Sequence, residues 1–180
     1  VLKLIDKIIE NPYDWISWYY EYDKRVEVSL DKQINSTQSQ PTFFYNHLML
    51  THTIYRYDSA GKHLISNTSE PSKQIYIDQI KYNNLISLKY FSALVDSYTK
   101  QNKPLVIIAL SDHGSRELKN RNEEKQIQLI VYDSEKKMGE IATNENPINL
   151  FRQLMNAYFG YQMPTQQNEY YDIYSGSTID

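Results

Sequence analysis

Asp112 and His113 are the residues whose types and position could do chemistry. They closely follow the apolar run from Leu105 to Leu110, and Gly114 comes next. A carboxylate oxygen and a neutral imidazole nitrogen are suitable ligands for a divalent ion such as zinc or manganese. Glycine allows the sharp turn that brings two adjacent side chains to face one centre. The pattern therefore predicts two metal ligands at the end of a buried strand.

The same Asp-His-Gly sequence also suits a plain turn, in which the carboxylate accepts hydrogen bonds from nearby amides and the imidazole is solvated. His52, which follows a second apolar stretch, also fits a structural, hydrogen-bonded role. Arg116 could hold an anionic substrate group, although exposure to solvent is the default for arginine. His47 and His63 are assigned no role.

The elements expected around these residues form a βαβ unit. Residues 42–50 are rich in aromatic and aliphatic side chains and predict a strand. Residues 74–99 predict a long helix with Leu88 and Phe91 on its apolar face, and residues 105–110 predict a strand covered on both faces. Two such strands should be parallel with a right-handed crossover. The carboxyl ends of both strands would then bring His52 and the Asp-His pair to one sheet edge, where ligands bind.

Further elements complete an α/β fold class. Residues 126–133 alternate in polarity and predict a third strand nearer an edge of the sheet. A helix is expected from Pro147, with Asn146 as its cap and Gly160 as its stop. Amphipathic helices are also expected over 2–10 and 14–34. We therefore divide the chain into an N-terminal helical segment, 1–40, an α/β region, 41–160, and a polar C-terminal tail, 161–180.

Composition excludes several classes of protein. The formal net charge of -3 is dispersed, with 19 basic and 22 acidic residues, so no basic stripe indicates a nucleic-acid partner. The absence of cysteine excludes thiolate ligands and a cysteine nucleophile. No apolar run approaches the roughly 20 residues needed to span a bilayer. Because the chain begins at Val1 within a helical pattern, we expect a processed product or a piece of a longer parent protein.

Three segments carry a resemblance to a known family. "PTFFYNHLMLTHTIYRYDSAGK", then "YIDQIKYNNLISLKYFSALVDSY" and "KPLVIIALSDHGSRE", resemble the C-terminal half of sulfatase-like hydrolases and transferases of the alkaline phosphatase superfamily. The likeness extends to "NPINLFRQLMNAYFG" and is greatest to lipoteichoic acid synthases and phosphoethanolamine transferases. It implies a partial alkaline-phosphatase-like sheet. It also implies that Asp112 and His113 are metal ligands and that His52 faces the substrate.

The resemblance also implies a function for a complete protein. Such enzymes catalyse nucleophilic displacement at the sulfur or phosphorus of a sulfate or phosphate ester, with the help of zinc, manganese, magnesium or calcium. The substrate can be linked to lipid or glycan. They act at the extracytoplasmic face of the membrane or in the periplasm, through an anchor that would lie upstream of this chain. The family carries its nucleophile in the N-terminal half, and no counterpart is visible here. This chain alone is therefore expected to bind metal weakly and to be inactive.

A noncatalytic α/β domain is the competing hypothesis. It would be a degenerate relative or a binding module, and its Asp-His pair would be structural. The proline that often lies beside the first histidine in the family is absent, since Thr51 precedes His52 and Thr53 follows it. The missing proline and nucleophile favour this hypothesis, and the retained Asp112, His113 and Arg116 oppose it.

Overall fold

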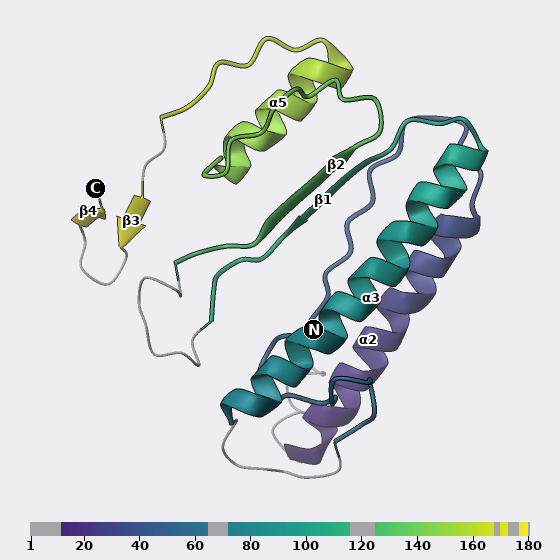
Figure 1. The fold of residues 1–180 in the computed structure, drawn as a ribbon, viewed down its shortest axis with the longest axis vertical. Helices are drawn as coiled ribbons and strands as arrows, with labels where there is room; N and C mark the ends of the chain where they lie inside the picture. The colour runs from purple at the N-terminus through teal and green to yellow at the C-terminus, as the bar shows by residue number, and fades with distance from the viewer. Residues whose placement is uncertain (1–11, 65–71, 116–124, 168–169, 173–176, 180) are drawn as a thin grey trace. The chain divides into compact units, whose positions relative to one another are not determined.

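A computed structural model describes residues 12–64, 72–115, 125–167, 170–172 and 177–179 (Figure 1). The described part of the chain is mixed α/β and forms two compact units, one within 1–103 and 107–131 and the other within 104–106 and 132–180. Its helices are α2 (Pro12–Asn35), α3 (Lys73–Lys100) and α5 (Pro147–Phe159). Its strands are β1 (Val106–Leu110), β2 (Leu129–Asp133), β3 (Tyr170–Asp172) and β4 (Ser177–Ile179).

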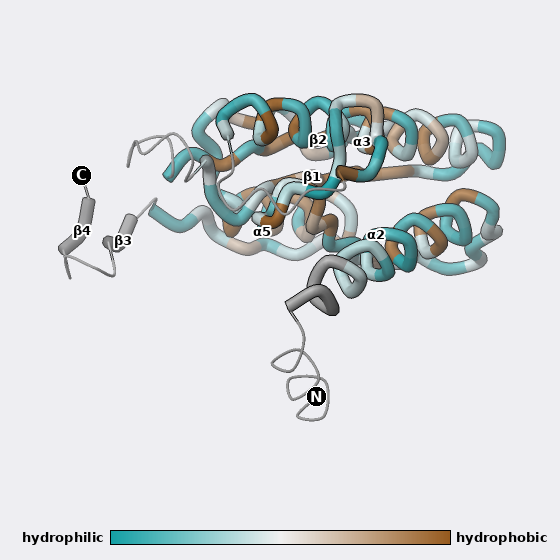
Figure 2. Tube along the Cα trace, turned by 90° about the horizontal axis from the view of Figure 1, so that it is seen from below, coloured by the Kyte–Doolittle hydropathy of each residue, from teal (hydrophilic) through white to brown (hydrophobic). Residues whose placement is uncertain are grey.

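α2 and α3 lie side by side and run in the same direction (Figure 1). Tyr90 donates to Glu27 at 3.2 Å, and Ser97 donates to the carbonyl of Ile34 at 2.5 Å. Both pairs are separated by 63 residues, which fixes the parallel register. Apolar and polar residues alternate along the two helices (Figure 2). The buried core between them and the returning chain consists of Leu30, Leu50, Tyr57, Ile86 and Tyr90.

The predicted strand over 42–50 is not formed, so the described residues contain no parallel βαβ unit. These residues follow α2 back along its length, and Gln33 and Asn46 exchange side-chain hydrogen bonds of 3.0 and 3.1 Å. Phe43 and Tyr45 are 76% and 77% exposed. A strand needs a neighbouring strand to receive its backbone hydrogen bonds. Within the described residues, none pairs with this segment.

β1 and β2 form a two-stranded antiparallel sheet. The amide of Ser111 donates to the carbonyl of Gln128 at one end, and that of Ser134 donates to Leu105 at the other, both at 3.0 Å. The strands predicted over 105–110 and 126–133 are both present, and they pair with each other in antiparallel orientation. The prediction that the first is covered on both faces is wrong, because its residues are half-buried and Leu110 is exposed.

α5 begins and ends where its sequence predicts. The Asn146 side chain accepts from the amide of Ile148 at 2.8 Å, Pro147 occupies the first turn, and Gly160 ends the helix in the left-handed conformation. The following residues return along the helix, held by two 2.9 Å hydrogen bonds between the Asn149 side chain and the backbone of Gln166. Within the predicted polar tail, β3 and β4 pair antiparallel. The helix predicted over 2–10 lies outside the described residues, and the three-part domain division stays a prediction.

Candidate functional site

The Asp-His pair lies in the turn that follows β1. The amide of His113 donates to Asp112 Oδ1 at 3.0 Å, so one carboxylate oxygen stabilises the turn. The Asp112 side chain is nevertheless 88% exposed and that of His113 is 36% exposed. The second oxygen, Oδ2, is therefore accessible to a ligand from solvent.

The orientation of the His113 ring follows from its own hydrogen bond. Its Nδ1 lies 2.6 Å from the carbonyl oxygen of Gly114, which can only accept, so Nδ1 carries the proton in the neutral ring. The lone pair then lies on Nε2, 3.7 Å from Asp112 Oδ2. That separation is too long for a hydrogen bond. It is close to the roughly 3.4 Å between two ligands of one tetrahedral zinc ion, whose bonds are about 2.1 Å long.

The pair supplies only two of the ligands that such an ion needs. A structural zinc site has four protein ligands and a catalytic one commonly has three. Over the ranges that the structure describes, no group of three or more His, Asp or Glu side chains could hold a metal. A complete coordination sphere would require donors from elsewhere in a parent protein. Arg116, the predicted anion contact, lies outside the described residues.

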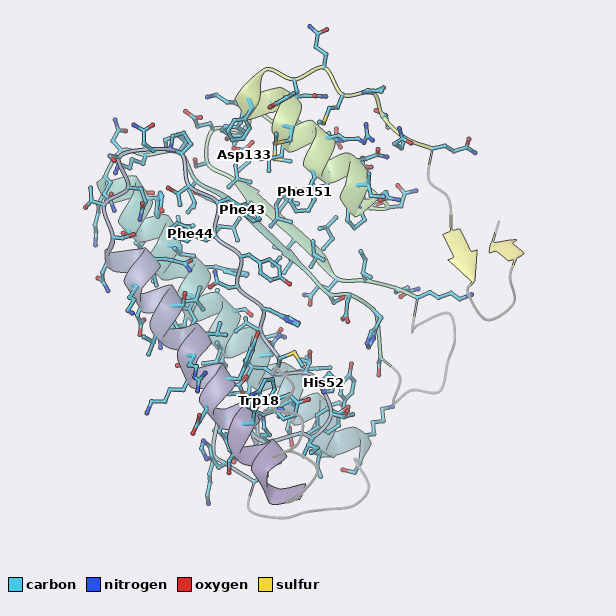
Figure 3. All side chains as sticks on the ribbon, turned by 180° about the vertical axis from the view of Figure 1, so that it is seen from behind. Trp18, Phe43, Phe44, His52, Asp133 and Phe151 are labelled. Atoms are coloured by element: carbon cyan, nitrogen blue, oxygen red, sulfur yellow. The ribbon has the colours of Figure 1, made fainter. Side chains whose placement is uncertain are left out.

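His52 lies beside the N-terminal part of α2, near Trp18 (Figure 3). The amide of His52 donates to the carbonyl of Met49 at 3.1 Å, so the residue belongs to a tight turn and not to the end of a strand. Its ring stacks against Tyr19 with centroids 5.7 Å apart, and its Nδ1 lies 3.2 Å from the tyrosine hydroxyl. The expectation that parallel strands bring His52 and His113 to one sheet edge is therefore not supported.

Arg56 holds the His52 turn against α2. Its guanidinium donates to the carbonyls of Met49 and Ile54, both at 2.9 Å, one on each side of His52. It also forms an ion pair of 3.0 Å with Asp23, and the side chains are 0% and 3% exposed. Bonds from one rigid planar group to both ends of the turn fix its backbone.

A buried polar cluster surrounds this ion pair. Gln79 of α3 accepts from the amides of Arg56 and Tyr57 at 2.8 and 3.1 Å, and Tyr57 donates to Asp23 at 3.4 Å. Burial raises the pKa of the Asp23 carboxyl, although Arg56 opposes the shift. Burial likewise raises the pKa of Tyr57. Asp23 Oδ1 and Gln79 Nε2 are buried and have no hydrogen-bond partner among the described residues.

This cluster was not predicted from the sequence. One signal was available, because Asp23 occupies the same helical face as Tyr19, Val26 and Leu30, at spacings of three and four residues. A carboxylate on an otherwise apolar face predicts a buried partner of opposite charge. Its partner Arg56 lies 33 residues away in an irregular segment, so no local pattern identifies it.

Nothing among protein families, curated proteins or solved structures matches this chain. The described helices include none that is long and apolar enough to cross a membrane.

Proposed function

We propose that this chain is the C-terminal portion of a metal-dependent, sulfatase-like ester hydrolase or phosphotransferase with an alkaline-phosphatase-like catalytic domain. The observation that carries the proposal is the 3.7 Å separation between His113 Nε2 and Asp112 Oδ2, which suits two ligands of one divalent ion. The nucleophile and the remaining ligands would come from the rest of the parent protein.

Each residue then has a defined task. Asp112 and His113 would hold a zinc, manganese, magnesium or calcium ion, which when bound lowers the pKa of a hydroxyl nucleophile and stabilises charge on ester oxygens. His52 would bind the ester or give a proton to the leaving group. Arg116 would contact the anionic group. The substrate would be a sulfate or phosphate ester, linked to lipid or glycan, at the extracytoplasmic face of the membrane or in the periplasm.

A noncatalytic α/β binding domain is the second candidate. The observation that favours it is the 3.0 Å hydrogen bond from the His113 amide to Asp112 Oδ1, because this bond alone would account for an aspartate in the turn. The two candidates differ in what Asp112→Asn should do. The substitution keeps an oxygen for the turn but removes the charge that a metal requires.

The complete parent protein allows a direct test. Metal content by elemental analysis and hydrolysis of nitrophenyl phosphate, phosphodiester and sulfate esters would be measured for wild type, Asp112→Asn and His113→Ala. Both variants should lose metal and activity and keep their fold. Asp96→Asn and His47→Ala provide matched controls, because both residues are exposed and lie outside the proposed site. Full metal content and activity in Asp112→Asn would instead show that Asp112 is a structural turn residue, and would favour a noncatalytic role for this segment of the parent protein.

A further inference from the structure

Within the described part of the chain, the His52 ring is held at only one of its two nitrogens. Nδ1 lies 3.2 Å from the Tyr19 hydroxyl oxygen and also contacts the carbonyl oxygen of Thr53. Because a carbonyl oxygen only accepts, Nδ1 carries a proton, and this N–H group donates to both oxygens. Among the residues that the structure describes, none forms a hydrogen bond with Nε2. The neutral ring therefore keeps the lone pair on Nε2.

Tyr19 is itself fixed on a regular element. It is a buried residue of α2, and the guanidinium carbon of Arg56 lies 4.6 Å from the centroid of its ring. The rings of Trp18 and Tyr19 pack edge to face at a centroid distance of 5.0 Å. A side chain with so many neighbours has little rotational freedom, so its hydroxyl is a rigid reference point for the imidazole.

The backbone that carries His52 is tied to the same place. Arg56 binds the carbonyls of Met49 and Ile54, on either side of His52, while Asp23 holds Arg56 from α2. Asp23 and Tyr19 lie one helical turn apart. One face of α2 thus fixes both the turn and the ring plane of the histidine.

From this geometry we propose that Tyr19 is a positioning residue for His52. Its phenolic oxygen, together with the Thr53 carbonyl, keeps the proton on Nδ1 and leaves Nε2 as the nitrogen presented to the substrate. The proposal rests on the proposed function, in which His52 faces the ester. Nε2 would accept a proton or a hydrogen bond when the ring is neutral and would donate one when the ring is charged. Nδ1 stays bound to Tyr19 and Thr53 in both states.

The tautomer of His52 can be measured without any enzymatic activity. Long-range ¹H–¹⁵N NMR correlations of the imidazole rings distinguish Nδ1–H from Nε2–H, and alkaline pH keeps the rings neutral. Wild-type His52 should show the Nδ1–H pattern. Tyr19→Phe keeps the ring beneath Arg56 and leaves Thr53 as the single acceptor for Nδ1–H, so a fraction of the Nε2–H form should appear beside the Nδ1–H form. An Nε2–H pattern in the wild type, or identical patterns in the two proteins, would overturn the proposal.

Tyr22→Phe is the matched control. Tyr22 lies on the same helix, and its ring and that of His47 are arranged edge to face with centroids 6.4 Å apart. The variant should leave the tautomer of His52 unchanged, and an equal change in both variants would refute a specific role for Tyr19. The wild-type spectrum alone tests the tautomer, so the proposal can be refuted even if Tyr19→Phe does not fold.

Kinetics of the parent protein separate this proposal from the proposed function. Tyr19→Phe should lower kcat roughly tenfold with little change in KM. A general acid or base contributes a rate enhancement of roughly 10²–10⁴-fold, and part of it is lost when the group is misoriented. An unchanged kcat in an active parent would overturn the role of Tyr19. A parent without ester hydrolysis would refute the proposed function and leave the NMR result to decide the positioning of His52.

Discussion

Arg56 and Asp23 form an ion pair of 3.0 Å that joins the His52 turn to α2 and is almost fully shielded from water. Taking two charges out of water is costly, and their attraction offsets that cost only where further hydrogen bonds satisfy them. Arg56 has these bonds, to Met49 and Ile54, whereas Asp23 Oδ1 has no partner among the described residues. The pair therefore specifies which segments come together more than it adds net stability.

Arg56→Met should destabilise the chain by roughly 3–5 kcal/mol, because Asp23 would be left buried without its counter-charge. Urea unfolding followed by circular dichroism would measure the loss. Arg25→Met is the control, since Arg25 forms a 3.1 Å ion pair with Glu21 on the same helix but in solvent, where such pairs contribute about 0–1 kcal/mol. Similar losses in the two variants would show that the buried pair does not hold the turn.

Asp133 should make the stability depend on acid pH. Burial alone would raise the pKa of its carboxyl, but hydrogen bonds from the amides of Met138 and Glu135 and from the Tyr158 hydroxyl outweigh burial and lower it. A lowered pKa in the folded state means that the unfolded chain binds the proton more readily. The carboxylate therefore stabilises the fold above its ordinary pKa of 3.8, and this contribution is lost as pH falls through the lower, folded value.

Urea midpoints of wild type and Asp133→Asn, compared between pH 6 and pH 2.5, would test this dependence. The difference between the two proteins should be largest at pH 6 and should shrink in acid. Asp96→Asn should follow the wild type throughout. A difference that stays constant or grows as pH falls would contradict the assignment.

Gly61 and Gly139 differ in what a side chain would meet. Both have positive φ, of 83° and 73°, so alanine costs about 1–2 kcal/mol at either position. A Cβ at Gly61 would also lie 2.9 Å from Cζ of Tyr82, whereas nothing lies within 4 Å at Gly139. Gly61→Ala should therefore destabilise the fold more than Gly139→Ala does, by about 1–3 kcal/mol of additional overpacking. Its melting temperature should accordingly be the lower of the two. Equal melting temperatures would show that the Tyr82 ring moves aside freely.

Local signals explain what the sequence could predict. Asn146, Pro147 and Gly160 specify the ends of α5 through their own backbone preferences, and the structure confirms them. The turn at Asp112 and His113 was predictable for the same reason, because adjacent residues and a glycine need no distant partner.

Interactions between distant segments explain the errors. Residues 42–50 have the composition of a strand, but pairing depends on a neighbour that composition does not reveal. On α3, Leu88 was predicted on the apolar face and is 65% exposed, whereas Tyr90 is 2% exposed. The tyrosine can face inward because Glu27 of α2 accepts from its hydroxyl, and this contact spans 63 residues.

The metal half-site is the central claim, and paramagnetic Mn²⁺ tests it most directly. Titration of the ¹⁵N-labelled chain with Mn²⁺ should broaden the amide signals near Asp112 and His113 first, with weak affinity because the pair provides only two ligands. Zn²⁺ should reverse the broadening, and Asp112→Asn and His113→Ala should abolish it, whereas Asp96→Asn should not. If broadening instead centres elsewhere, or persists unchanged in Asp112→Asn, the two residues do not hold a metal.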